Sequence, residues 1–148
     1  MKKRILIDKA TEVVSDKINE LKSEILDLQD AMNADGKSTV GDKHETNRAI
    51  IQNEIEQLGK QLSAHEQHLR VFSGIDFNHT HDYVESGSYV LTNKYNLFMG
   101  ISLGKINIEG EDVQFVSMES PIAQALLQKK VGEEVDFHDQ RIQILEIH

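Results

Sequence analysis

Two stretches in the first half of the chain repeat apolar residues at alternating steps of four and three, and no proline interrupts either stretch. The repeated positions of the first stretch are Val14, Ile18, Leu21, Ile25, Leu28 and Met32. Those of the second stretch are Ile51, Ile55, Leu58, Leu62, His65, Leu69 and Phe72. This spacing aligns side chains along one side of an α-helix, and charged or amide side chains fill the other positions. The pattern therefore predicts two long helices with one apolar seam each.

The segment between the stretches, residues 34–41, reads Ala-Asp-Gly-Lys-Ser-Thr-Val-Gly and lacks a helical period. Because the connection is short, we expect the chain to fold back so that the two seams face each other in an antiparallel coiled-coil hairpin. Each arm of about 26 residues would span roughly 40 Å at 1.5 Å per residue. Residues 1–75 are expected to form this finger, with its tip at about residues 34–46 and Asp8 as the N-cap of the first helix.

The pattern changes in residues 76–148, where short β-rich runs are separated by Gly and Asn. Strands are predicted at residues 88–92, 97–103, 113–117, 134–137 and 141–147. Ser120-Pro121 predicts the start of a short helix, because serine caps free N–H groups and proline fits the first helical position. Lys129, Lys130 and Gly132 are expected to close this helix. Strands with one packed helix predict a small α+β domain.

Composition excludes several classes of protein. The chain has no cysteine, which removes disulfides, thiolate metal sites and Cys nucleophiles. A net charge of −9 argues against stand-alone DNA binding. The apolar run Ile5-Leu6-Ile7 is too short for a signal peptide, and no apolar stretch approaches the ~20 residues of a membrane span. We therefore expect a soluble, cytoplasmic protein and, if the hairpin closes within one chain, a monomer.

Two segments resemble motifs of the Gre transcript cleavage factors. Residues 120–135, which begin Ser-Pro-Ile-Ala and continue to Lys-Lys-Val-Gly-Glu-Glu-Val, are similar to the C-terminal signature of that family, with Gln128 where a Gly is usual. Gly41-Asp42-Lys43-His44-Glu45-Thr46 is similar to the tip motif Gly-Asp-x-x-Glu-Asn, at the start of the second helix as the family requires. The chain thus resembles a divergent Gre-type elongation factor over nearly its whole length.

The resemblance implies a function for each part. The C-terminal domain would be FKBP-like and would dock on RNA polymerase, while the finger would enter the polymerase secondary channel. Asp42 and Glu45 would be tip acids that help hold a second Mg²⁺ at the polymerase active site, near the RNA 3′ end. The protein would carry no cofactor of its own. It would be no enzyme itself but would stimulate the cleavage of backtracked RNA by the polymerase.

Departures from the family motif leave an alternative open. Thr46 replaces the usual Asn, and Ala49 stands near the position of an absent aromatic residue. The chain could therefore be a channel-binding regulator that modulates or inhibits transcription without stimulating cleavage. The spacing of Asp42 and Glu45 is also that of a capping box, in which both side chains satisfy backbone N–H groups. A prolyl isomerase and a coiled-coil adaptor are the rival classes of function.

Histidines supply the other candidate residues. His65 falls on the second seam, where a polar residue is typical of a packing or register device. His79 and His81 have the alternate spacing of metal ligands, but the sequence indicates no third ligand for them. His44 lies between the two tip acids and titrates near neutrality. Lys37, Lys43 and Arg48 add positive charge to the tip.

Overall fold

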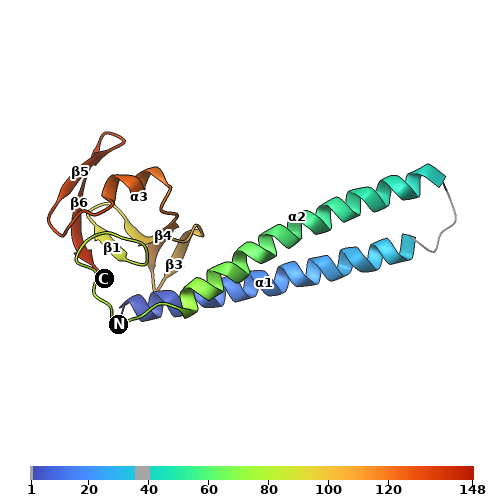
Figure 1. Cartoon of the computed structure of the whole chain (residues 1–148), viewed down its shortest axis with the longest axis horizontal. Helices are drawn as coiled ribbons and strands as arrows, with labels where there is room; N and C mark the ends of the chain where they lie inside the picture. The colour runs from blue at the N-terminus through green and yellow to red at the C-terminus, as the bar shows by residue number, and fades with distance from the viewer. Residues whose placement is uncertain (1, 36–40) are drawn as a thin grey trace. The chain divides into compact units, whose positions relative to one another are not determined.

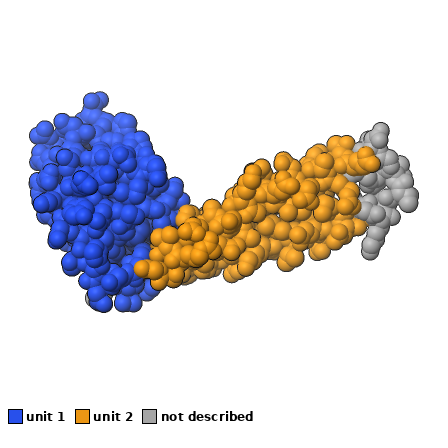
Figure 2. Space-filling view, in the orientation of Figure 1, with its two compact units in different colours: residues 1–10, 75–148 blue, residues 11–74 orange. Residues whose placement is uncertain are grey.

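The computed structural model describes the backbone of residues 2–35 and 41–148, and the side chains of residues 3–34 and 45–148. The elements are α1 (Lys2–Asp35), α2 (Gly41–Ser73), β1 (Tyr89–Thr92), β2 (Asn96–Met99), β3 (Gly104–Ile108), β4 (Glu111–Val116), α3 (Pro121–Leu126), β5 (Glu134–Phe137) and β6 (Gln140–Ile147). They fall into two compact units (Figures 1 and 2). Residues 11–74 form the hairpin unit, and residues 1–10 with 75–148 form the sheet unit.

Burial in the hairpin unit follows the predicted seams. Val14, Ile18, Leu21 and Phe72 are buried, and every other seam residue is half-buried. The apolar residues Leu26 and Ile50 lie off the seams and are 59% and 60% exposed. Two helices alone cannot enclose a seam, because each seam side chain is covered from one direction only. The period in the sequence therefore identified which residues pack between α1 and α2.

Two interactions between α1 and α2 show the direction of pairing. Arg48 donates a hydrogen bond to the carbonyl oxygen of Met32 at 3.5 Å. Lys17 lies close enough to His65 to lower, after burial, the pKa of that histidine. The two pairs have nearly the same midpoint in the chain, at residues 40 and 41, as an antiparallel hairpin requires. The predicted hairpin of long N-terminal helices is confirmed (Figure 1).

The start of α1 differs from the prediction. The helix begins at Lys2, so Asp8 lies inside it and is not an N-cap. Leu6, Ile7 and Ala10 are at most 3% exposed. These first turns belong to the sheet unit. Packing within that unit stabilises the helix at residues that precede the heptad pattern. Over the residues described, none of the helices is long and apolar enough to cross a membrane.

The sheet unit is built on six strands in the order β3-β4-β2-β1-β6-β5. Among the described strands, β2 and β4 pair in parallel and the other neighbours pair antiparallel. On one face, Ala123 and Leu126 of α3 join a buried cluster with Leu97, Met99 and residues of β1 and β6. On the other face, Phe98 of β2 and Phe115 of β4 lie with ring centroids 5.4 Å apart. The predicted α+β class is confirmed.

Two boundaries in this unit differ from those predicted. The strand expected at 97–103 ends at Met99, and a separate strand, β3, follows at Gly104–Ile108. Gly100 and Gly104 both have positive φ, so the chain turns between the two strands. A Cβ at Gly100 would come within 2.7 Å of Ser86 Oγ, so no larger residue fits there without a shift. Helix α3 ends at Leu126, before the predicted end at Lys129 to Gly132, because Leu127 leaves the helical conformation with ψ 130° and Gln128 follows with φ 64°.

Candidate functional site

The two predicted tip acids lie in the first turn of α2, which begins at Gly41. Residues three apart are neighbours on a helix surface, so Asp42 and Glu45 share one side of α2. The side chain of Glu45 is exposed, and that of Asp42 lies outside the described residues. The helix dipole favours negative charge at an N-terminus, which suits both residues whatever else they bind. Their roles as metal-holding or capping residues stay predictions.

The remaining tip residues are described only in part. Lys37 and the side chains of Lys43 and His44 lie outside the described residues. Arg48 is exposed and donates to the carbonyl oxygen of Met32. A positive side chain at the end of α1 meets the partial negative charge of that helix terminus, which is favourable. Arg48 therefore has a structural contact within the hairpin besides any contact with a nucleic acid.

A pair of histidines lies farther along α2. The rings of His65 and His68 stand edge to face with centroids 5.5 Å apart. Among the residues that the structure describes, none accepts from or donates to Nδ1 of either ring. Burial lowers the pKa of both histidines, and Lys17 lowers that of His65 further, as His65 does that of His68. The hairpin thus favours the neutral form of both rings, in agreement with a packing role at the seam.

The C-terminal signature has a clear structural basis. Ser120 Oγ accepts a hydrogen bond from the Ala123 N–H at 3.3 Å and donates one to the Ser117 carbonyl oxygen at 2.7 Å. Pro121 follows in the first turn of α3, as predicted. The turn after α3 pairs with the loop before β1, since the Gln128 N–H donates to Val84 O and the Val84 N–H donates to Lys129 O, both at 2.8 Å. The signature therefore joins α3 to the rest of the sheet unit.

Gln128 illustrates a departure from the family pattern. Its φ of 64° lies in the left-handed region, where glycine is free of strain and most other residues are not. A Gly at this position of the motif is explained by that conformation. The chain keeps the turn with a glutamine, so the backbone hydrogen bonds around Val84 outweigh the local strain.

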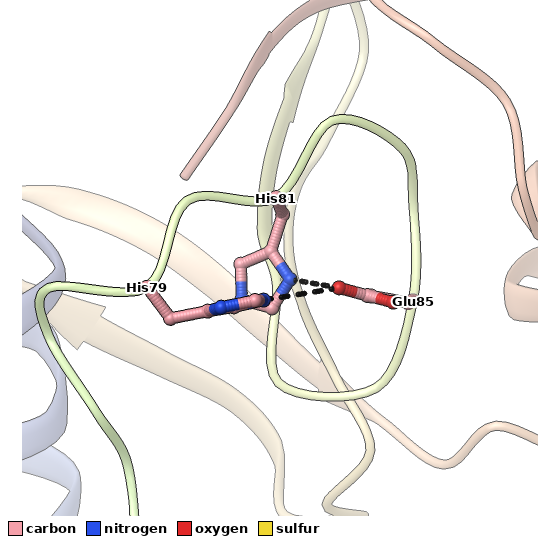
Figure 3. Close-up of side chains that lie close together, drawn as sticks. All are labelled: His79, His81 and Glu85. Carbon is pink, nitrogen blue, oxygen red and sulfur yellow. Dashed lines mark hydrogen bonds and ion pairs between the residues drawn. The ribbon is translucent and has the colours of Figure 1, made fainter.

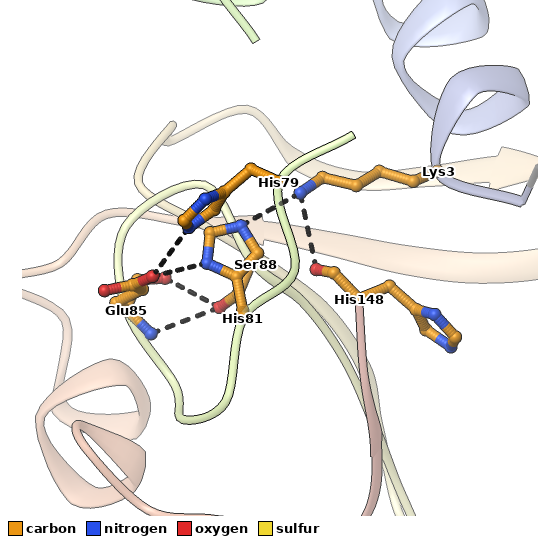
Figure 4. Close-up of polar contacts among 6 residues, drawn as sticks. All are labelled: Lys3, His79, His81, Glu85, Ser88 and His148. Atoms are coloured by element: carbon orange, nitrogen blue, oxygen red, sulfur yellow. Dashed lines mark hydrogen bonds and ion pairs between the residues drawn. The ribbon is translucent and has the colours of Figure 1, made fainter. Parts of the chain in front are cut away.

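A polar cluster that the sequence indicated only in part lies in the loop between α2 and β1. His81 Nδ1 and Glu85 Oε1 are 2.6 Å apart, and His79 Nε2 is 3.4 Å from the same oxygen (Figure 3). Lys3 Nζ lies 3.2 Å from His81 Nε2 and donates to the His148 carbonyl oxygen at 3.3 Å (Figure 4). The spacing of the histidines was visible in the sequence. Glu85 and Lys3 carried no signal, because the fold brings them to the loop.

Comparison with known proteins supports the motif analysis. Residues 105–148, less than a third of the chain, match the family model described as "Transcription elongation factor, GreA/GreB, C-term". The matched segment runs from β3 to the end of the chain and contains α3 with its Ser120 cap. No curated protein sequence matches the chain.

Two solved structures are also similar. The crystal structure of GreA factor homolog 1 (Gfh1) of Thermus thermophilus is 14% identical, with 93% of this chain and 94% of that chain covered and a TM-score of 0.39. A structure of the transcription factor Gfh1 is 15% identical, with 93% and 92% covered and a TM-score of 0.38. At these values the assignment rests on the sequence match. On that match, the resemblance noted at residues 120–135 is confirmed, and residues 105–148 are similar to the C-terminal domain of the GreA/GreB transcription elongation factors.

Proposed function

We propose that this protein is a transcription elongation factor that binds the secondary channel of RNA polymerase and stimulates the cleavage of backtracked RNA. One observation carries the proposal: residues 105–148 match the GreA/GreB C-terminal domain, in a chain that also has a long helical hairpin. Homology to the Gre family implies RNA polymerase as the partner. Gre factors modulate the polymerase and are not themselves enzymes, so the cleavage chemistry belongs to the polymerase.

The hairpin is long enough for this function. Helix α2 has 33 residues from Gly41 to Ser73, which at about 1.5 Å per residue corresponds to roughly 50 Å. Its first turn, with Asp42 and Glu45, is the end of the hairpin unit farthest along α2 from residue 74. In the described part of these first turns, Glu45, Thr46 and Ala49 are exposed. A projection of two helices can enter a channel that a globular domain cannot.

Asp42 and Glu45 are proposed to act as ligands or water-orienting groups at the polymerase active site. Carboxylate oxygens are the donors that Mg²⁺ prefers, and a partner need supply only one or two of them. A second Mg²⁺ stabilises the attacking and leaving oxygens of phosphodiester cleavage. This chain would supply the two acids, which are three residues apart in the first turn of α2. Negative charge is favoured at this end of a helix.

A channel-binding regulator that does not stimulate cleavage is the second candidate. Thr46 stands where the family motif has Asn, and Ala49 stands near the place of an aromatic residue. Both positions are exposed in the first turns of α2, where they would face the channel rather than the seam. In this version the hairpin occupies the channel and modulates or inhibits transcription without stimulating cleavage.

A cleavage assay on stalled elongation complexes tests the proposal. Wild-type protein should release short RNA 3′ fragments, and Asp42→Asn and Glu45→Gln should each reduce the cleavage rate on the order of tenfold or more, since each removes a charge from the metal site. Glu54→Gln is the matched control, because Glu54 is an exposed acid on the same helix beyond the tip. Its rate should equal that of wild type.

Polymerase binding measured on the same variants separates the two candidates. Wild-type protein that binds polymerase, competes with a blocker of the secondary channel and releases no fragments would favour the regulator. Absence of any binding would reject both candidates and leave the rival classes, of which a coiled-coil adaptor is tested by oligomeric state and a prolyl isomerase by peptide isomerisation.

A further inference from the structure

Three potential metal ligands converge in the loop between α2 and β1. One ring nitrogen of His79, one of His81 and a carboxylate oxygen of Glu85 all lie within 4.8 Å of one another (Figure 3). His79 is 55% exposed at its side chain, Glu85 is 31% exposed and His81 is 7% exposed. The cluster is thus anchored on a buried ring and open to solvent on the side of His79. Neither the Gre resemblance nor the proposed function makes use of it.

The fold holds the Glu85 end of the cluster in place. Ser88 is fully buried, and its Oγ accepts from the Glu85 N–H at 3.3 Å and donates to the Glu85 carbonyl oxygen at 2.6 Å (Figure 4). Val84 is also fully buried, and it forms backbone hydrogen bonds with Gln128 and Lys129. Glu85 is thus held between two buried residues and needs little ordering before it binds an ion.

The contact between His81 and Glu85 affects both groups. Burial lowers the pKa of His81, although the hydrogen bond with Glu85 opposes this effect. The hydrogen bond with His81 lowers the pKa of Glu85.

We propose that His79, His81 and Glu85 bind one divalent transition-metal ion of the Zn²⁺ class, with a fourth position open to water or to a ligand from a partner. Two imidazoles and a carboxylate suit Zn²⁺ far better than Mg²⁺ or Ca²⁺, which prefer all-oxygen sites. Tetrahedral ligands at about 2.0–2.1 Å from the ion lie roughly 3.3 Å apart. The His79–Glu85 contact of 3.4 Å already has this length, and the His81–Glu85 contact of 2.6 Å must lengthen.

Lys3 competes with the ion for His81. An ammonium group can only donate, so Lys3 Nζ makes His81 Nε2 an acceptor at 3.2 Å, and the ring proton lies on Nδ1 toward Glu85. A metal on Nδ1 requires the proton on Nε2, where it would face the ammonium group. Lys3 must then give up His81 and keep only the His148 carbonyl oxygen. The geometry therefore predicts that Lys3 weakens metal binding and that its removal strengthens it.

Zinc titration of the full-length, chelator-treated protein tests the site, with competition against a colorimetric zinc indicator as the readout. We expect one Zn²⁺ per chain at this site, with affinity reduced about tenfold or more in His79→Ala and in Glu85→Gln. Both side chains are partly exposed, so the variants should fold, as circular dichroism will show. His138→Ala removes another exposed histidine and should leave the affinity unchanged. Excess Mg²⁺ should not displace the zinc.

Lys3→Met sharpens the test, because methionine keeps the aliphatic contacts of the buried lysine stem and removes the charge. Zinc should bind at least about threefold more tightly to this variant. An unchanged or weaker affinity would overturn the assignment of His81 Nδ1 as a ligand. Imidazole ¹⁵N spectra provide an independent readout: the His81 proton should lie on Nδ1 in the free protein and on Nε2 with zinc bound.

Other outcomes reject the site altogether. The proposal is wrong if zinc shows no saturable binding, or if His79→Ala and Glu85→Gln bind zinc as wild type does. Zinc binding abolished by His68→Ala but kept in His79→Ala would assign the ion to the histidine pair of α2. None of these results bears on RNA cleavage, so the metal site and the proposed function stand or fall separately.

Discussion

The hairpin unit and the sheet unit are stabilised in different ways. In the hairpin, the seam residues from Ile25 to Leu69 are only half-buried, and their contacts follow from a repeat along the chain. In the sheet unit, Leu97, Phe98 and Met99 of one strand are all fully buried, so both faces of β2 are covered. Burial on this scale depends on partners far away in the sequence. The hairpin is therefore encoded locally and has a thin core, while the sheet unit contains the deeply packed core.

The largest expected effect tests the core of the sheet unit. Phe98→Ala removes a fully buried ring that packs beside Phe115, and it should reduce the free energy of unfolding by about 3–5 kcal/mol. Urea unfolding followed by amide hydrogen exchange should show the loss in β1, β2 and β4. A change smaller than that of a hairpin seam residue would contradict the proposed difference between the units.

A smaller effect is expected at the middle of the hairpin. Leu58→Ala truncates a half-buried seam residue and should reduce stability by about 1–2 kcal/mol, because less apolar area is lost than in a closed core. Exchange should accelerate in α1 and α2 and remain unchanged in the sheet strands. Leu26→Ala, at an exposed off-seam position, is the control and should have little effect. Equal losses in both variants would argue against the seam.

The histidine pair should make the stability of the hairpin depend on pH. Burial lowers the folded-state pKa of His65, so protonation favours the unfolded chain. Hairpin stability should therefore fall as the pH drops through about 6.5, the ordinary histidine pKa, and should level off below the folded-state value. His65→Leu should remove part of this dependence and stabilise the hairpin by about 1 kcal/mol at neutral pH, since the unpartnered Nδ1 is lost. Helical circular dichroism against temperature at several pH values provides the measurement; a wild-type transition independent of pH would contradict this account.

The smallest expected effect concerns a single turn of the sheet unit. Gln128→Gly should stabilise the protein by about 0.5–1 kcal/mol, because relief of the left-handed strain exceeds the added entropy of the unfolded chain. Gln128→Ala keeps the strain and should give no such gain, so the difference between the two variants isolates the backbone effect. Thermal unfolding midpoints of the three proteins suffice. A less stable glycine variant would show that the Gln128 side chain has a role of its own.

Local patterns in the sequence determined much of this protein. The two heptad seams predicted the residues that pack in the hairpin, because a period of 3.5 residues is a property of one helix and needs no distant partner. Ser120-Pro121 predicted the start of α3 for the same reason, since a cap bonds to N–H groups within three residues. The Gre motif at residues 120–135 indicated the similarity that the family model finds over residues 105–148, because the residues of the motif are close together in the chain.

Only the tertiary structure decided the features that join distant segments. The parallel pairing of β2 with β4 and the separation of β2 from β3 depend on the turn at Gly100 and on neighbours across the sheet. The inclusion of residues 1–10 in the sheet unit brings Lys3 to His81, 78 positions along the chain, and the loop turn brings Glu85 to both histidines. A pattern along the sequence reports which side of an element is apolar. It does not report which other element that side will meet, because that choice is made by the packing of the whole unit.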